Sequence, residues 1–303
     1  MRIVVTGGAG FIGSHLVERL VWRGHDLVVL DNLVTGKEDN LQKVINEIDF
    51  IEGDIRDDEL VKRLLKGADV VAHLAALTSV SESMEEPYLY HEINTSGTLR
   101  LLQLSVESGV KNFLFVSSCA VYGDPTKIPI KETDPISPLS IYAATKASAE
   151  AYCQAYNSMG IRTCVLRLFN VYGPRQGFSQ YSGVISQFTE RTRKGQPPII
   201  FGDGKQTRDF AYVGDVATLM ATAVEKFSEG VFNVGSGKSS TIKGLAETLA
   251  RTMGKPDLQP VYEEPRPGEV RYSRADISRA RKVFGFRPEV SLEEGLRLTV
   301  RRL

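Results

Sequence analysis

The first 31 residues, MRIVVTGGAGFIGSHLVERLVWRGHDLVVLD, constrain the fold of this chain more than any other stretch. Residues 2–6 form a short apolar run that is typical of a buried strand, and the glycine-rich segment at 7–13 predicts a tight turn. Apolar residues then recur at helical spacing from 11 to 20, and a second strand is expected at 26–30, directly before Asp31. The order strand, turn, helix, strand predicts the start of a parallel α/β sheet.

This segment has the chemistry of a dinucleotide site. Glycine at Gly7, Gly10 and Gly13 lets the backbone approach a pyrophosphate, and the first turn of the next helix offers free N–H groups and the positive end of its dipole. Asp31 lies eighteen residues beyond Gly13, where a carboxylate can accept hydrogen bonds from the ribose hydroxyls of an adenosine. Because Asp31 would repel the 2′-phosphate of NADP, the sequence predicts NAD as the cofactor.

Charge and cysteine content argue against several other classes of protein. The chain has 303 residues, enough for one large or two modest domains, and its 37 basic residues are balanced by 37 acidic ones. A net charge of zero favours neither nucleic acid nor an anionic membrane as a partner. The three cysteines show no metal-ligand spacing, and no leader or membrane-spanning run is visible, so we expect a cytoplasmic protein without a metal site.

The alternation of strands and helices predicts a doubly wound, Rossmann-like parallel sheet over residues 1–170. Further strands are expected at 49–52, 68–74, 112–116 and 163–168, with helices at 94–108 and 142–158. From about Tyr172 glycine and proline become frequent, which predicts a smaller, mixed α/β substrate domain over 171–303. Segments at about 210–240 are expected to return to the first domain.

Tyr142 and Lys146 are candidates for proton-transfer chemistry. In YAATK they lie four residues apart on an expected helix, so their side chains project from one face. An ammonium beside a phenol favours the phenolate, as does a positively charged nicotinamide, and moving a tyrosine pKa from about 10 to about 7 needs about 4 kcal/mol. Tyr142 is therefore a candidate general acid/base. His73, at the end of an apolar strand, is interpreted as a packed residue and not as a catalyst.

Four motifs, GGAGFIG, SSCAVYG, YAATK and RLFNVYGPR, together resemble those of the extended short-chain dehydrogenase/reductase family, in particular its nucleotide-sugar epimerases and dehydratases. The resemblance covers nearly the whole chain. It implies that Tyr142 takes a proton from a sugar hydroxyl as hydride passes to NAD, that Ser118 hydrogen-bonds the reacting oxygen, and that Lys146 also holds the nicotinamide ribose. It further implies a homodimer, joined by a four-helix bundle from the helix after Asn94 and the helix that carries Tyr142.

The same resemblance assigns residues to both ligands. For NAD these are Gly7, Gly10, Phe11, Ile12, Gly13, Asp31, Asn32, Thr35, Gly36, Asp54, Ile55, Leu74, Ala75, Ala76, Asn94, Ser117, Tyr142, Lys146 and Phe169. For a UDP-sugar they are Ser118, Tyr142, Asn170, Val184, Phe201, Arg208, Arg266, Glu269, Arg271 and Ser273. Arg208 and Arg266 fall on positions that clamp a diphosphate, and Arg271 is an alternative to Arg266. In the family one position contacts the 2-substituent of the hexose. Here that position corresponds to Ser273, which leaves room for an N-acetyl group, whereas an insertion of one residue relative to the family would place Tyr272 at it.

Two positions distinguish among the reactions of this family. Dehydratases carry an Asp-Glu pair directly after the catalytic Thr, and decarboxylating relatives carry a Glu two residues before the Tyr-Gly, because these reactions need an additional acid or base. Here the positions are Cys119 and Ala120, and Cys119 is interpreted as a packing residue. The resemblance therefore implies a UDP-hexose 4-epimerase that interconverts UDP-glucose and UDP-galactose.

Alternatives are a 4-epimerase of UDP-N-acetylglucosamine or UDP-glucuronate, or a dehydratase whose acid comes from elsewhere. A protein that only senses NAD is disfavoured, because it needs no proton-transfer site.

Overall fold

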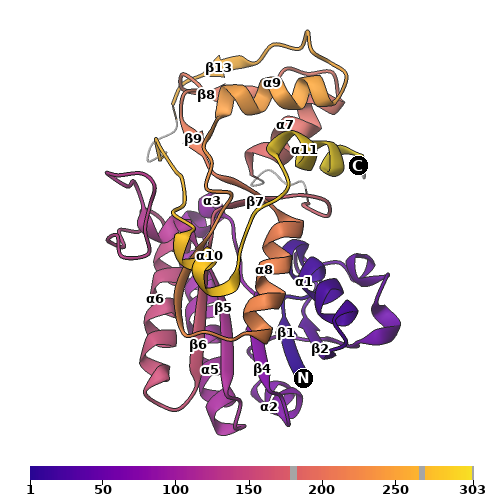
Figure 1. Ribbon diagram of the computed structural model, residues 1–303, viewed down its shortest axis with the longest axis vertical. Helices are drawn as coiled ribbons and strands as arrows, with labels where there is room; N and C mark the ends of the chain where they lie inside the picture. Colours follow the sequence, from indigo (N-terminus) through magenta and orange to yellow (C-terminus); the bar gives the residue numbers. More distant parts are fainter. Residues whose placement is uncertain (178–182, 266–269, 302–303) are drawn as a thin grey trace.

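The computed structural model describes residues 1–177, 183–265 and 270–301, and its centre is a seven-stranded parallel sheet (Figure 1). The strands are β1 (Arg2–Thr6), β2 (Asp26–Asp31), β3 (Asp49–Glu52), β4 (Val70–His73), β5 (Asn112–Ser118), β6 (Arg162–Leu168) and β11 (Gly230–Val234). Their order is β11-β6-β5-β4-β1-β2-β3, and every neighbouring pair is parallel. The order reverses between β1 and β4, where open α/β sheets bind ligands beyond the carboxyl ends of their strands. The predicted Rossmann-like fold is confirmed.

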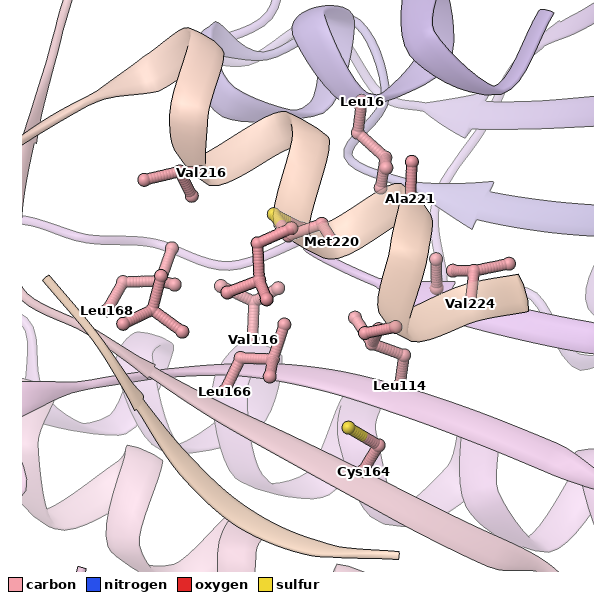
Figure 2. Close-up of a cluster of buried hydrophobic side chains, with 14 of the residues drawn as sticks. Leu16, Leu114, Val116, Cys164, Leu166, Leu168, Val216, Met220, Ala221 and Val224 are labelled. Atoms are coloured by element: carbon pink, nitrogen blue, oxygen red, sulfur yellow. The ribbon is translucent and has the colours of Figure 1, made fainter. Parts of the chain in front are cut away.

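Helices cover both faces of this sheet because successive strand residues point to opposite sides. Ile3 and Val5 contribute to one core, under α1 (Phe11–Trp22), α8 (Val213–Glu225) and α10 (Ser278–Phe284). Val4 contributes to the other, under α2 (Asp58–Leu65), α5 (Gly97–Glu107) and α6 (Ile141–Asn157). Figure 2 shows the first core, in which Met220 and Val224 of α8 lie above Leu114 and Leu166 of the sheet.

Residues 213–234 belong to this main layer although they come late in the sequence. The helix α8 packs against α1, and β11 pairs with β6 so that Gly230 lies opposite Cys164. The small residues Ala217, Ala221 and Ala223 on α8 are fully buried, which lets the helix approach its neighbours closely. The chain therefore returns to the sheet after building part of the smaller region.

The smaller region lies beyond the carboxyl ends of the strands, at the top of Figure 1. It contains α7 (Val184–Arg193), α9 (Ile242–Thr252) and α11 (Leu292–Val300) around a separate apolar cluster. Three two-stranded pairs complete it: β7 (Asn170–Tyr172) with β10 (Phe210–Tyr212), β9 (Thr207–Arg208) with β12 (Ser240–Thr241), and β8 (Ile199–Phe201) with β13 (Val261–Glu263). None of the helices in the described ranges is long and apolar enough to cross a membrane.

The segment between β4 and α5 differs from the prediction. The expected helix at 94–108 is divided into a π-helical turn at His91–Ser96 and α5, and the short helices α3 (Val80–Glu85) and α4 (Pro87–Tyr90) precede it. Short 3₁₀ turns at Glu38–Leu41, Ile45–Glu47 and Cys119–Tyr122 complete the chain. A π-turn inserts one residue into the helical repeat, which apolar periodicity does not reveal, and such turns are frequent at functional sites.

Candidate active site

The glycine turn lies at the reversal point of the sheet. Gly7 has φ +71°, and a Cβ added there would lie 2.6 Å from the backbone nitrogen of Ala75, just after β4. A Cβ added to Gly13 would overlap the carbonyl oxygen of Gly7. Because Gly10 precedes α1 and has no side chain to cap it, the N–H groups of the first helical turn face this loop without a side-chain acceptor. The close backbone approach and the available N–H groups fit a pyrophosphate, and the predicted contacts of these glycines with NAD stay a prediction.

Asp31 lies beside this turn at the end of β2. Its Oδ2 atom accepts a hydrogen bond from Ala9 N–H at 2.9 Å, and Oδ1 accepts one from Leu33 N–H at 2.9 Å. A Cβ added to Gly36 would lie 2.7 Å from Oδ1, so only glycine lets the loop approach the carboxylate this closely. The structure therefore brings Asp31 and Gly36 together with the glycine turn, whereas Thr35 is exposed.

Asp54 was expected near the adenine, and in the structure it is paired with an arginine. Arg56 donates to both carboxylate oxygens, each at 2.9 Å, and Asn32 donates from Nδ2 at 3.0 Å. These bonds to Arg56 hold the pKa of Asp54 near 2. Ile55 is buried beside Gly97. Sequence reasoning missed Arg56, because an arginine two residues after an acid is common on any surface.

Ser118, Tyr142 and Lys146 meet at the carboxyl end of β5. Ser118 Oγ accepts a hydrogen bond from Ala120 N–H at 3.2 Å, and its hydroxyl lies close enough to Tyr142 to lower the pKa of the phenol. Helix α6 begins at Ile141, where Ser140 caps the N–H of Ala143 at 3.1 Å, and this fixes Tyr142 in the first helical turn. Lys146 follows one turn later and donates from Nζ to Val116 O at 2.9 Å. The structure therefore brings the buried side chains of Tyr142 and Lys146, and the partly exposed Ser118, to the carboxyl end of β5.

Burial is the largest influence on the pKa values of Tyr142 and Lys146. Burial raises the pKa of Tyr142 to about 12, the bond to Ser118 opposes this, and Cys119 adds to it. Burial lowers the pKa of Lys146 to about 8, and the charge of Glu150 opposes this. The sequence attributes a lowered tyrosine pKa to Lys146 together with a positively charged nicotinamide, and this stays a prediction.

Sequence reasoning missed a buried ion pair behind this cluster. Arg167 of β6 donates from Nη2 to Glu150 Oε2 at 2.6 Å and from Nε to Oε1 at 3.0 Å, and both side chains are buried. Ser117, which was expected to contact NAD, donates from Oγ to Glu150 Oε1 at 2.5 Å. The Ser117 side chain is therefore engaged with the ion pair. Two sequence features could have predicted this ion pair. Glu150 lies four residues after Lys146 on the same expected helix, and Arg167 is a charged residue within an apolar strand.

Residues after β6 lead from the sheet into the smaller region. Phe169 is buried and donates from N–H to Val234 O at 2.8 Å, and Asn170 N–H bonds to Asp209 O at 3.1 Å. Asp209, which sequence reasoning missed, is fully buried, and its carboxylate accepts N–H bonds from 236, 237 and 275. It thereby ties together the segments that carry Asn170 and Ser273.

The expected substrate arginines have different surroundings. Arg208 donates from Nη1 to Val270 O at 2.7 Å, and its charge partly opposes the rise that burial causes in the pKa of Cys119, so it lies on the Ser118 side of the site. Arg271 is paired with Asp203 at 2.7 and 2.8 Å. Arg266 and Glu269 lie outside the described residues.

The remaining substrate candidates line the smaller region. Val184 begins α7, and Phe201 ends β8. Ser273 is buried, and its N–H bonds to Thr207 O at 3.2 Å, whereas Tyr272 is 46% exposed. The two neighbouring side chains therefore point in opposite directions.

Comparison with known proteins agrees with this geometry. Residues 3–235 match the model of the NAD dependent epimerase/dehydratase family. A putative UDP-glucose 4-epimerase of Methanocaldococcus jannaschii is 41% identical over 98% of this chain and 97% of its own length. UDP-glucuronic acid decarboxylase 1 of Arabidopsis thaliana is 35% identical over 98% of this chain and 68% of its own.

Solved structures are similar over the whole chain. Thermotoga maritima UDP-glucose 4-epimerase with UDP-glucose has a TM-score of 0.94 and 43% identity, covering 100% of this chain and 98% of that one. The complex of Thermus thermophilus UDP-glucose 4-epimerase with NAD has a TM-score of 0.90 and 41% identity, with coverage of 100% and 98%. A UDP-N-acetylglucosamine 4-epimerase of Methanobrevibacter ruminantium has a TM-score of 0.95 and 40% identity, with coverage of 99% and 97%. This chain belongs to the NAD dependent epimerase/dehydratase family, whose members act on nucleotide sugars with NAD as cofactor.

Proposed function

We propose that this chain is a UDP-hexose 4-epimerase that interconverts UDP-glucose and UDP-galactose. The observation that carries the proposal is the placement of Ser118, at the end of β5, near the buried phenol of Tyr142, with Cys119 and Ala120 where dehydratases and decarboxylases place carboxylates. Because Cys119 and Ala120 carry no carboxylate, oxidation and re-reduction at C4 is the reaction that these side chains support. Relatives at about 40% identity that are named UDP-glucose 4-epimerase agree with it.

In this proposal Tyr142 Oη takes the proton of the sugar 4-hydroxyl and later returns it, while Ser118 Oγ hydrogen-bonds the same oxygen. NAD, which the glycine turn and Asp31 would hold, would supply the reversible hydride acceptor for C4, so that hydride could return to either face of the sugar. Moving the Tyr142 pKa from about 12 towards 7 requires about 7 kcal/mol of additional stabilisation of the phenolate. The positive charges of Lys146 and of the oxidised nicotinamide are available for this purpose.

The nucleotide is held in this proposal by the smaller region, and the hexose is free to turn. Arg208, near Cys119, is the proposed partner of the diphosphate. The inward side chain of Ser273 and the outward one of Tyr272 favour a pocket wide enough for an N-acetyl group. We therefore expect UDP-N-acetylgalactosamine to be a second substrate.

Incubation of the purified protein with UDP-galactose, and separately with UDP-N-acetylgalactosamine, tests the proposal. No reductant is added, and the products are resolved by chromatography. Formation of the C4 epimer from both sugars is the expected result, and conversion of UDP-galactose alone would contradict the wide pocket. If neither sugar reacts while UDP-glucuronate is epimerised or decarboxylated, or water is lost from a nucleotide sugar, the proposed substrate class is wrong.

The family resemblance also leads us to propose a homodimer through α5 and α6. Sedimentation of the protein at low micromolar concentration tests this, and a mass close to the 33.4 kDa of one chain would contradict it.

A further inference from the structure

His73, at the end of β4, is a buried polar residue that the proposed mechanism does not use. Its ring is 1% exposed and lies between those of Phe113 and Phe115, each with a centroid 5.8 Å away. Both ring nitrogens have a threonine partner: Nδ1 lies 2.7 Å from Thr6 Oγ1, and Nε2 lies 2.9 Å from Thr98 Oγ1. Burial, together with the charge of Lys146, lowers the pKa of His73 to about 3. The imidazole is therefore neutral at physiological pH.

The direction of these two hydrogen bonds follows from the neighbours of the threonines. Thr98 Oγ1 donates its single hydrogen to Asn94 O at 2.6 Å, so it must accept from His73 Nε2–H. A neutral ring then has an unprotonated Nδ1, which accepts the hydrogen of Thr6 Oγ1. Thr6 Oγ1 in turn accepts Ala75 N–H at 3.4 Å. Only the neutral Nε2–H tautomer satisfies every group.

The hydrogen bonds continue from Asn94 to the catalytic helix. Asn94 lies in the π-turn, where its Nδ2 donates to Leu77 O at 2.9 Å and to Thr145 Oγ1 at 3.2 Å. Thr145 Oγ1 donates to Tyr142 O at 2.8 Å. A continuous route, which we call the Thr6–Tyr142 chain, therefore passes from the glycine turn through His73, Thr98, Asn94 and Thr145 to the first turn of α6.

We propose that His73 is a positioning residue whose fixed Nε2–H tautomer holds the π-turn, and through it the Tyr142 backbone, at a set distance from the glycine turn. This role rests on the proposed function, in which Tyr142 must meet a sugar oxygen beside a cofactor bound at that turn. A small displacement of a reacting group lowers the rate of the chemical step steeply. Because Arg208 and the smaller region hold the nucleotide in that function, cutting the Thr6–Tyr142 chain lowers kcat and leaves KM nearly unchanged.

The tautomer is tested directly on the full-length protein labelled with ¹⁵N-histidine. The protein has four histidines, so the His73 signals are assigned from their loss in His73→Gln. We expect a protonated Nε2 and an unprotonated Nδ1 that do not change between about pH 5 and about pH 8. An Nδ1–H form, or titration within this range, overturns the proposal whether or not the protein is an epimerase.

Two substitutions of His73 separate positioning from packing. The Gln amide nitrogen reaches the place of Nε2 and can donate to Thr98, whereas the Asn oxygen takes the place of Nδ1 and keeps only the bond to Thr6. We expect His73→Asn to lose about tenfold or more in kcat and His73→Gln to stay within about threefold of wild type. Equal losses in the two variants would show that His73 acts by packing alone.

Thr98 gives the next link with a matched control. Thr98→Val should lose kcat as His73→Asn does, and Thr98→Ser should restore it. Thr163→Val removes another buried threonine hydroxyl, which is bonded to Cys153 O at 3.0 Å and lies outside the Thr6–Tyr142 chain, and should retain kcat despite a similar loss of stability. If kcat in all three variants falls in proportion to their loss of stability, the proposal is wrong.

If wild type converts no UDP-hexose, the proposed function fails, and the backbone amide signal of Tyr142 decides the coupling instead. It should shift in Thr98→Val and not in Thr163→Val, and an unchanged signal in both overturns the proposal.

Discussion

The ion pair between Glu150 and Arg167 gives the sharpest prediction on stability. Their side chains are 6% and 4% exposed, and Arg167 donates at 2.6, 3.0 and 3.1 Å to the two carboxylate oxygens. Glu150→Gln removes the charge with little change in volume and leaves the guanidinium with Tyr122 Oη at 2.8 Å and Glu132 O at 3.3 Å. Because a buried charge without its counterion is costly, we expect a loss of about 3 to 5 kcal/mol in the free energy of unfolding.

A double-mutant cycle measured by urea unfolding at pH 7 checks this magnitude. Arg167→Met should cost a similar amount, because it leaves the carboxylate buried with Ser117 as its donor. The double variant should lose clearly less than the sum, with a coupling of about 2 kcal/mol or more, since it removes both charges together. Glu190→Gln, at an exposed pair with Arg193, is the control and should leave the free energy of unfolding unchanged.

Additive losses in this cycle would refute the reasoning, because they would mean that the two charges do not stabilise each other.

Glu150→Gln also has a second readout, the pH dependence of turnover. Glu150 opposes the lowering of the Lys146 pKa, so Glu150→Gln should move the alkaline limit of turnover to lower pH. An unchanged pH profile would indicate that Glu150 acts on stability alone.

Three further predictions concern single residues. Tyr142→Phe should lower kcat by about 10² to 10⁴ while NAD stays bound, and a variant as active as wild type would remove the proposed mechanism. His73 has a pKa of about 3 in the folded protein and about 6.5 when unfolded, so the unfolded state binds more protons between these values, and folding weakens as pH falls from 6.5 towards 3. Urea unfolding should show that the stability advantage of wild type over His73→Gln shrinks by about 2 kcal/mol from pH 7 to pH 5, and a constant difference would contradict the neutral histidine. Thr192 is fully buried, and the described residues offer no partner to its Oγ1, so Thr192→Val should raise the free energy of unfolding by about 1 kcal/mol, and a loss would indicate an unseen partner.

The sequence by itself determined the elements of the main layer and the residues whose chemistry is local. Strands β1, β2 and β3 and helix α1 lie where apolar period and glycine spacing predict them, since these signals act over a few neighbouring residues. Tyr142 and Lys146 could be found for the same reason, because one helical turn separates them wherever the helix lies.

Only the tertiary structure decided which distant groups meet. It paired Glu150 with Arg167, engaged the Ser117 hydroxyl with that pair, and gave His73 a partner on each ring nitrogen. It also set the pKa of Tyr142 near 12, because burial depends on everything packed around the phenol and not on its helical neighbour alone. A sequence pattern records period and residue type, whereas charge pairing and desolvation depend on distances in space that no local pattern contains.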